Sequence, residues 1–316
     1  MRIFLTGSSG YVGTNLILQL QSQYDITGFD TAPSQLTNID FVQGSLLDID
    51  LLREIFMKTN FDAVIHLGAL KDAADSVSKP DLYMQTNVVG TKNLIQSMSE
   101  NLCKRIIFAS SAAVYDSDSG IEMKVESSAT TPISPYGLSK LLAEELILDF
   151  SDRKIIEPTI LRFFNVTGGN CVVNSKLKQK DFISLAVRAS ILSNSISIYG
   201  NRFPTLDGTA IRDYINVSDV VGAIQKVIDG PKQVTNAKIY NVSTGTGVSV
   251  LEIINQVQTI SGKSIEYKME AAREGEIGYS VGNSGLLQSD YGWKPKSSLQ
   301  DSIAQVVESE LLKTQV

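Results

Sequence analysis

The sequence predicts an α/β protein in which a doubly wound parallel sheet is accompanied by a smaller, interleaved lobe. Short β-rich runs alternate with longer helical patterns throughout the first half of the chain. A glycine-rich turn directly follows the first of these runs, and after Asn165 the alternation gives way to polar loops. Strands joined by helices build a parallel sheet with crossover helices on its faces. The first half is therefore expected to form that sheet.

The expected strands are short apolar runs, and the expected helices lie between them. Strands are expected at residues 2–6, 26–29, 63–67, 105–109 and 156–162. Helices are expected at residues 12–20, 48–57, 88–97 and 136–150. These elements assign residues 1–165 to one domain.

Residues 166–316 are expected to form mainly the smaller lobe, with segments that return to the first domain. A helix is expected at residues 182–192, followed by a turn-rich stretch at residues 199–208 that holds Asn, Pro, Asp and Gly. The sequence has no internal repeat of fixed period and no low-complexity linker. The two lobes are therefore expected to be interleaved.

Composition and charge narrow the classes of function. The chain has 316 residues, of which 43% are hydrophobic and 20% charged, as in a folded globular protein long enough for two lobes. Its net charge of −6 offers no basic stripe, so nucleic acid is not an expected partner. An anionic small molecule remains compatible, because a few Arg or Lys side chains in a cleft act locally.

Cysteine usage and hydropathy predict a cytoplasmic protein. Cys103 and Cys171 are too few for a disulfide framework and lack metal-ligand spacing, so neither a disulfide nor a metal site is expected. Residues 1–5 are too short an apolar stretch for a signal peptide. No later run approaches the ~20 apolar residues of a membrane span, so no membrane partner is expected.

A glycine-rich motif, TGSSGYVG, follows the first expected strand and opens the first expected helix. Gly7 permits a tight turn, Gly10 lets backbone N–H groups approach a pyrophosphate, and Gly13 allows close packing of helix on sheet. The alternative is a surface turn that happens to lack side chains. Its position at the first strand–helix junction favours a dinucleotide-binding Rossmann domain.

Asp30 ends the second expected strand, about twenty residues beyond the glycines, where a carboxylate accepts bonds from a ribose diol. A 2′-phosphate would be repelled there, and the next residues, Thr31 to Pro33, supply no compensating cation. The sequence therefore predicts NAD as cofactor. A solvated carboxylate at a strand end is the structural alternative.

Tyr136 and Lys140 lie four residues apart at the start of an expected helix, and this spacing places them on one face. A free phenol has a pKa of ~10. The nearby ammonium and a positive nicotinamide ring are expected to lower that pKa into the working range of a base. The YxxxK pattern is common by chance, and the preceding dinucleotide motif is what gives it weight.

Ser111 stands at the end of the fourth expected strand, in the run FASSAAVY. At this edge, where parallel strands deliver their ligands, its hydroxyl is placed to hydrogen-bond a reacting oxygen. A helix-capping serine is the structural alternative.

The chain resembles the UDP-glucose 4-epimerase family of extended short-chain dehydrogenases/reductases. The similarity covers nearly the whole chain, through the segments TGSSGYVGTNL, HLGALK, SVSKP, TNVVGT, SSAAVY, SPYGLSK, LRFFNVTGG, YGNRFPTLDGTAIRDYINV, YNVSTGTGVSVLEII and REGE. It implies a 4-epimerase of UDP-hexoses, UDP-glucose and UDP-galactose or their N-acetylamino counterparts, that forms a homodimer.

The resemblance also assigns site residues. It implies a catalytic triad of Ser111, Tyr136 and Lys140. It implies cofactor contacts at Tyr11, Val12, Asp30, Ser45, Leu46, Leu67, Gly68, Lys71, Asn87 and Phe164. It implies sugar-nucleotide contacts at Asn165, Tyr199, Arg212, Arg273 and Glu276, and a gate for the sugar's 2-position at Ser280.

The sequence departs from the family at several positions. Ser45 replaces a usual aspartate, Asp116 a glycine, Phe163 a tyrosine and Asn216 a common histidine, and residues 171–180 are unlike the usual insertion. These departures affect the expected adenine contact at Ser45 and the uracil and ribose side of the pocket at residues 171–180.

Three alternatives remain beside the epimerase. A nucleotide-sugar dehydratase, decarboxylase or reductase starts from the same oxidation, but the first two need an added acidic residue where Ala112 and Ala113 stand. A catalytically silent NAD-binding regulator has no reason to retain Ser111, Tyr136 and Lys140 together. A Ser-His-Asp hydrolase would need the sole histidine, His66, which lies in an expected strand and is expected to be a packed, hydrogen-bonded residue.

Overall fold

The computed structural model describes residues 1–37, 39–115, 120, 122–169, 181–231, 237–273 and 276–314. The chain divides into two compact units that take up alternating segments of the sequence. The first unit comprises Met1–Asp116, Ser128–Arg162 and Ile224–Tyr240, and the second comprises Ser117–Ser127, Phe163–Ala223 and Asn241–Val316. The domain limits expected from the sequence, 1–165 and 166–316, stay a prediction.

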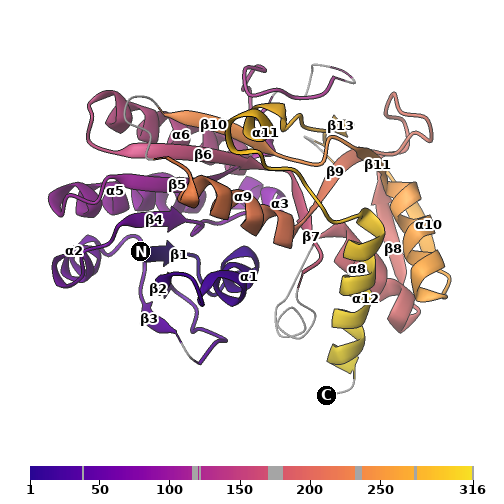
Figure 1. The fold of residues 1–316 in the computed structure, drawn as a ribbon. Helices are drawn as coiled ribbons and strands as arrows, with labels where there is room; N and C mark the ends of the chain where they lie inside the picture. Colours follow the sequence, from indigo (N-terminus) through magenta and orange to yellow (C-terminus); the bar gives the residue numbers. More distant parts are fainter. Residues whose placement is uncertain are drawn as a thin grey trace. The chain divides into compact units, whose positions relative to one another are not determined.

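The first unit is built on a seven-stranded sheet, which confirms the predicted fold class (Figure 1). The strand order is β10-β6-β5-β4-β1-β2-β3. The strands are β1 (Arg2–Thr6), β2 (Asp25–Asp30), β3 (Asp40–Gln43), β4 (Ala63–His66), β5 (Arg105–Ser111), β6 (Glu157–Phe163) and β10 (Lys238–Val242). Because β1 lies between β2 and β4, the order reverses at β1, and the loops after β1 and β4 flank the point where such sheets bind ligands.

The helices of this unit cover both faces of the sheet. They are α1 (Tyr11–Leu20), α2 (Ile49–Lys58), α3 (Ala73–Ser78), α4 (Pro80–Met84), the π-turn η1 (Gln85–Val89), α5 (Gly90–Glu100), the 3₁₀ turn η2 (Ala112–Val114), α6 (Pro135–Asp152) and the end of α9 (Val217–Asp229). Residues of α2, α5 and α6 share one apolar cluster with alternate residues of β1, β4 and β5. Hydrogen bonds of Gln23 and Tyr24 to Gln225 and Asp229 join the end of α1 to α9 on the other face (Figure 1).

Aromatic rings fill the cluster beneath α2. Phe4 of β1 contacts Phe29, Phe56 and Phe61 with ring centroids between 5.2 and 5.4 Å apart. Rings at these distances and tilted angles attract one another beyond the burial of their surface. Phe4 is completely buried, and so are its neighbours Ile3 and Leu5, whose side chains alternate to the opposite face. The first strand is thus fixed from both sides.

The second unit contains two small sheets and a helical layer of its own. The central strand β9 (Ile211–Asn216) pairs with β7 (Asn165–Thr167) and β13 (Tyr279–Ser280) in parallel and with β11 (Gly247–Ser249) antiparallel. The other sheet pairs β8 (Ser195–Tyr199) with β12 (Glu266–Glu270). The apolar cluster of this unit lies among α8 (Phe182–Leu192), α10 (Val250–Ser261) and α12 (Leu299–Thr314). The unit also contains α11 (Gly285–Tyr291) and the start of α9.

The expected elements of the first half are all present, with shifts at their ends. The strand expected at 63–67 ends at His66, and the strand expected at 105–109 continues to Ser111. The helix expected at 88–97 begins as a π-turn, because the Gly90 N–H bonds to the Gln85 carbonyl five residues back. The helix expected at 182–192 is α8.

Other expectations concern cysteines and membranes. Cys103 is buried, and this burial raises the pKa of its thiol to about 12, as suits an inert core residue. Cys171 lies outside the described residues. Within the described part of the chain, no helix has the length and apolarity needed to cross a membrane.

The glycine turn after β1 yields the first testable prediction. A Cβ on Gly13 would lie 2.2 Å from the Gly7 carbonyl oxygen, so Gly13→Ala forces backbone atoms apart. We expect Gly13→Ala to lower the free energy of unfolding in urea by about 1–3 kcal/mol and to weaken NAD binding measured by calorimetry.

Gly222→Ala is the control. This glycine lies in α9, and the nearest neighbour of its added Cβ would be the indole nitrogen of Trp293, at 3.8 Å. An alanine there is expected to leave NAD binding unchanged and to stabilise the fold slightly. Equal effects of the two substitutions would contradict the tight packing inferred for Gly13.

Candidate active site

The glycine turn forms a closely packed cradle at the N-terminus of α1. Gly7 adopts a φ of +72°, and a Cβ there would lie 2.7 Å from the Gly68 nitrogen. Gly10 is the N-cap of α1 and provides no side chain to cap the helix. The first N–H groups of a helix bind anions well, because they lack partners within the helix and the helix dipole adds positive potential. The turn is therefore suited to an anion, and the pyrophosphate contact expected of its glycines stays a prediction.

Asp30 ends β2 beside this turn, with its carboxylate held by backbone groups. One oxygen accepts a bond from the Ser9 N–H at 3.0 Å, and the other accepts a bond from the Ala32 N–H at 3.0 Å. A carboxylate oxygen has further acceptor capacity, so Asp30 is fixed in place and still able to accept bonds from a ribose diol. The contact of Asp30 with a ribose diol stays a prediction.

The loop after β4 carries further predicted cofactor residues. Leu67 and Gly68 follow the strand directly, and the Lys71 ammonium lies 5.8 Å from the centre of the Tyr11 ring. Asn87 reaches this loop from the π-turn, with its amide bonded to both the N–H and the carbonyl of Leu70. These residues and the glycine turn all belong to the first unit.

The remaining predicted cofactor residues differ in their surroundings. Leu46 is buried and contacts Gly90, whereas the Ser45 hydroxyl accepts a bond from the Leu47 N–H at 3.2 Å and so closes a local turn. Phe164 lies in the second unit, buried beside Gly282. Val12 lies in the first turn of α1. The cofactor contacts expected at these positions stay predictions.

Ser111, Tyr136 and Lys140 come together at the carboxyl end of β5. The side chains of Ser111 and Tyr136 are hydrogen-bonded to each other. Ser111 also caps η2 by accepting a bond from the Ala113 N–H at 3.2 Å. The helix-capping serine considered as an alternative is therefore compatible with the position of Ser111 beside Tyr136. Tyr136 lies in the first turn of α6, which begins at the N-cap Ser134. The helix thus presents Tyr136 to the strand end.

Lys140 lies one helical turn beyond Tyr136, and its ammonium is nearly buried. Its Nζ donates to the Ala109 carbonyl at 2.8 Å and lies 4.8 Å from the centre of the Phe108 ring. Burial lowers the pKa of Lys140 to about 7, and the carboxylate of Glu144 partly opposes that shift. Lys140 is therefore poised to change charge near neutral pH.

The pKa of Tyr136 is raised among the protein's own groups. Burial raises the pKa of its phenol, and the hydrogen bond from Ser111 opposes this increase. The sequence argument expected the Lys140 ammonium to lower the pKa of Tyr136. Among the protein's own groups burial outweighs any lowering of the Tyr136 pKa by the Lys140 ammonium, which is bonded to Ala109 and whose charge is itself disfavoured by burial. The combined effect expected of the ammonium and a bound nicotinamide ring stays a prediction.

A buried ion pair holds the catalytic helix against the sheet. Glu144 of α6 accepts two bonds from the Arg162 guanidinium, at 2.9 and 2.6 Å, and a third from the Ser110 hydroxyl. Both charged side chains are almost fully buried. Ser110 immediately precedes Ser111, so the pair connects α6 to β5 and β6 next to the reacting groups. Sequence reasoning missed Glu144 and Arg162, although Glu144 follows Lys140 at helical spacing.

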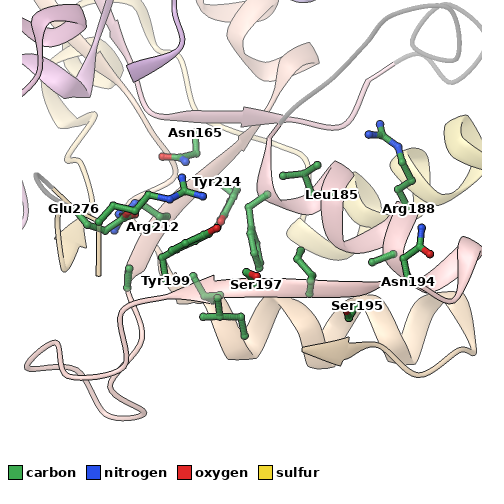
Figure 2. A pocket seen from close by; sticks show the side chains of 17 residues that line it. Asn165, Leu185, Arg188, Asn194, Ser195, Ser197, Tyr199, Arg212, Tyr214 and Glu276 are labelled. Atoms are coloured by element: carbon green, nitrogen blue, oxygen red, sulfur yellow. The ribbon is translucent and has the colours of Figure 1, made fainter. Parts of the chain in front are cut away.

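The second unit contains a cavity of about 590 Å³ (Figure 2). Five of the six predicted substrate residues line it: Asn165, Tyr199, Arg212, Arg273 and Glu276. The Arg273 guanidinium lies 3.6 Å from the centre of the Tyr199 ring, and Arg212 lies 3.5 Å from the Glu276 carboxylate. Arg188 also lines the cavity, and the guanidinium groups of Arg212 and Arg273, which the sequence predicted, suit the oxygens of a diphosphate.

Ser280 is not among the residues that line this cavity. It lies on β13, paired in register with Arg212 of β9, so the two side chains project from the same face of their sheet. Tyr279 projects from the opposite face, where its ring lies near Gly247 of β11. The structure therefore places Ser280 beside a cavity residue.

Sequence reasoning missed several residues of the cavity wall. Leu185 and Arg188 of α8, Ser197 of β8 and Tyr214 of β9 line it (Figure 2), as do Phe182, Ala189, Asn194, Ser195, Ile196, Ile198, Ala210 and Val250. The spacing of Phe182, Leu185 and Ala189 is helical and would have indicated one face of α8. The small and apolar residues of β8 carry no chemical signal of this kind.

The departures from the family have mixed outcomes. Asn216 bonds to the Ser302 hydroxyl at 2.9 Å and the Gln305 amide at 2.8 Å, so it joins β9 to α12. Asp116 and residues 171–180 lie outside the described residues. No cluster of His, Cys, Asp and Glu able to hold a metal ion occurs among the residues that the structure describes, and none was expected.

Comparison with known proteins assigns the chain to a family. Residues 3–243 match the model of the NAD dependent epimerase/dehydratase family, and the chain belongs to that family. UDP-glucose 4-epimerase of Yersinia enterocolitica is 32% identical, with 96% of this chain and 95% of the relative covered. The human UDP-glucose 4-epimerase is 30% identical, with 92% and 91% covered.

A solved structure is similar over the whole chain. UDP-glucose 4-epimerase from Bifidobacterium longum in complex with NAD+ and UDP superimposes with a TM-score of 0.91 at 27% identity, and 99% of each chain is covered. The family is NAD-dependent, so NAD is the cofactor of this chain. The contacts assigned to the glycine cradle and Asp30 stay predictions. The predicted resemblance, fold and cofactor are confirmed.

The buried ion pair yields the second testable prediction. Glu144→Gln leaves the Arg162 charge buried without its carboxylate, which costs about 3–5 kcal/mol in the free energy of unfolding. Urea unfolding should show this loss. The control is Glu54→Gln on α2, which removes an exposed pair with Lys58 and should cost less than about 0.5 kcal/mol. Similar losses in both variants would contradict the role assigned to Glu144.

Proposed function

We propose that the protein is an NAD-dependent UDP-hexose 4-epimerase. The observation that carries this proposal is the group formed by Ser111, Tyr136 and Lys140 at the end of β5, in a chain whose second unit holds a cavity lined by three arginines. The substrates are UDP-glucose and UDP-galactose, their N-acetylamino counterparts, or both pairs. Each substrate is inverted at carbon 4 through a 4-keto intermediate.

The proposed chemistry gives each residue one task. Tyr136 takes the proton of the sugar 4-hydroxyl and returns it to the 4-keto oxygen, while the Ser111 hydroxyl stabilises the phenolate and bonds the reacting oxygen. Bound NAD supplies reversible acceptance of hydride from carbon 4. The Lys140 ammonium, held by the Ala109 carbonyl, adds positive charge that favours the phenolate.

The cavity of the second unit supports inversion by holding the nucleotide and leaving the sugar free to turn. Arg212 and Arg273 grip the diphosphate, so the keto sugar can rotate about the bonds that link it to the phosphate and present its other face. Asn165, Tyr199 and Glu276 complete the contacts assigned to the sugar nucleotide. A homodimer stays a prediction from the resemblance.

The residues after Ser111 favour an epimerase over the related reactions. Ala112 and Ala113 form the 3₁₀ turn where a dehydratase or decarboxylase needs an acidic side chain. Neither alanine can donate or accept a proton at the neighbouring sugar carbon. A reductase of the same superfamily or a silent NAD-binding protein is compatible with these alanines, and a product assay separates both from an epimerase.

The assay that tests the proposal is incubation of the purified protein and NAD with UDP-glucose, UDP-galactose and their N-acetylamino counterparts, followed by analysis of the sugars. An epimerase yields the 4-epimer without net accumulation of NADH. Steady NADH release with an oxidised sugar would indicate a dehydrogenase, and a 6-deoxy product would indicate a dehydratase. A strong preference for NADP would contradict the role given to Asp30.

Tyr136→Phe tests the proton acceptor. The change removes one hydroxyl and keeps the ring, so fold and NAD binding should be retained while turnover falls by about two to four orders of magnitude. Turnover is measured with the substrate pair found in the assay, and NAD binding is the control. Near-normal turnover would remove Tyr136 from the mechanism.

Ser280 supports a further statement about substrate breadth. The resemblance places a gate for the sugar's 2-position at this residue, where an aromatic ring would overlap an acetamido group. Ser280 shares a sheet face with Arg212 of the cavity, and Tyr279 projects the other way, so the small side chain is the one on the face of Arg212. We therefore propose that N-acetylated UDP-hexoses are accepted.

Ser280→Tyr tests the gate. The added ring should suppress turnover of the N-acetylated pair selectively, because a steric clash costs more than a lost contact. The measurement is the ratio of kcat/KM for UDP-N-acetylglucosamine to that for UDP-glucose. A wild type that ignores N-acetylated sugars, or a variant that slows both pairs equally, would show that Ser280 is not the gate.

A further inference from the structure

A chain of buried hydrogen bonds runs through the first unit and includes the sole histidine of the protein. It passes from Thr6 at the end of β1 to His66 of β4, Thr91 of α5, Asn87 of the π-turn and Ser139 of α6. All five side chains are at most 2% exposed. His66 is thus the packed, hydrogen-bonded residue expected from the sequence, and its partners give it a further task.

The positions of the hydrogen atoms in this network follow from its geometry. The Thr91 hydroxyl donates to the Asn87 carbonyl at 2.6 Å, so at His66 Nε2, 2.9 Å away, it can only accept. His66 therefore carries its proton on Nε2. In a neutral ring Nδ1 is then an acceptor, and the Thr6 hydroxyl donates to it at 2.7 Å while accepting from the Gly68 N–H at 3.1 Å. From Gly68 to Asn87, each group thus donates its hydrogen bond to the next group in the network.

Asn87 links the network to the catalytic helix, α6. Its amide nitrogen donates to the Ser139 hydroxyl at 2.8 Å, and Ser139 donates to the Tyr136 carbonyl at 2.8 Å. The same amide bonds to the backbone of Leu70 through both of its ends. Asn87 lies in the π-turn and is its buried residue.

His66 stays neutral in this setting. Burial and the nearby Lys140 ammonium lower the pKa of His66 to about 3. A second ring proton on Nδ1 would also face the Thr6 hydroxyl, which would have to turn its own proton away. The network therefore keeps one arrangement across the physiological pH range.

We propose that His66 is a positioning residue that sets the distance between the Gly68 turn and the first turn of the catalytic helix. One end of its network is the N–H of Gly68, beside the Gly7 turn, and the other is the carbonyl of Tyr136. His66 contacts neither substrate nor cofactor in this role. The kinetic part of the test rests on the proposed epimerase function, and the spectroscopic part does not.

The spectroscopic test reads the ring directly. With ¹⁵N-labelled histidine the protein gives one ring spin system, because it has one histidine. Two-bond couplings to the ring protons distinguish Nε2 from Nδ1. We expect the proton on Nε2 and no titration of the ring between pH 8 and pH 5. A proton on Nδ1, or titration near pH 6.5, would overturn the proposal whatever reaction the protein catalyses.

The kinetic test breaks the network at Thr91. Thr91→Val keeps the shape of the side chain and removes the hydroxyl between His66 and Asn87. The distance between the Gly68 turn and the helical turn that carries Tyr136 is then no longer fixed. We expect kcat to fall about tenfold, within the hundredfold that a 1 Å misplacement can cost. The KM for the UDP-sugar should stay the same, because the cavity residues of the second unit are untouched. Thr91→Ser restores the hydroxyl and should restore kcat.

The matched control is Ser97→Ala on the same helix. Ser97 is fully buried and its hydroxyl donates to the Asn93 carbonyl, the same four-residue return bond that Thr91 makes, but Ser97 is not part of the network. Its kcat should equal that of the wild type at temperatures well below unfolding. Equal kcat losses in Thr91→Val and Ser97→Ala, an unchanged kcat in Thr91→Val, or no recovery in Thr91→Ser would each overturn the proposal.

Discussion

The close approach of two backbone turns, one after β1 and one after β4, is the constraint on which the site of the first unit depends. Gly7 lies so near the Gly68 backbone that no side chain fits between them. This approach follows from the strand order, since β4 is the direct neighbour of β1 on the side where the order reverses. Apart from Phe164, which belongs to the second unit, the residues assigned to the cofactor lie on these turns and on the loops and helices beside them.

Electrostatics in the first unit follow one rule: each buried charge has a specific partner. Arg162 meets Glu144 through two hydrogen bonds, and Lys140 meets a carbonyl and an aromatic ring instead of a carboxylate. An ammonium without a carboxylate partner is less stable when buried, so Lys140 can lose its proton near neutral pH, whereas the Arg162 charge is permanent. The two buried cations thus differ in how firmly they hold their protons.

Most of the first half of the fold could be predicted because most of its strands are largely buried and flanked by helices of regular spacing. The strand β3 was missed, because Asp40 to Gln43 are four residues of partial exposure without an apolar run. The short strands of the second half carry no periodic signal, and β13 has only two residues. Their pairing with β9 depends on contacts between distant segments that no local pattern encodes.

The parts of the candidate site differ in how far they could be predicted from the sequence. Glycines and the Tyr136/Lys140 spacing are local signals, and the structure brings these residues to the same strand ends. The substrate residues came from resemblance, and five of the six line one cavity. The raised pKa of Tyr136 could not be foreseen, because burial depends on the packed structure around the phenol. The direction of the hydrogen bonds through His66 likewise needs the positions of two hydroxyls, those of Thr6 and Thr91, and of two backbone groups, those of Gly68 and Asn87.

The arginines of the cavity have a consequence for how an anionic ligand arrives. Arg188 and Arg212 each face a glutamate, and Arg273 stacks on Tyr199. Paired cations project little field into solvent, and the chain as a whole is negative. Capture of a nucleotide diphosphate is therefore governed by short-range hydrogen bonds formed after entry, not by attraction from a distance. Association should depend only weakly on ionic strength, and selectivity should reside in the rate of dissociation.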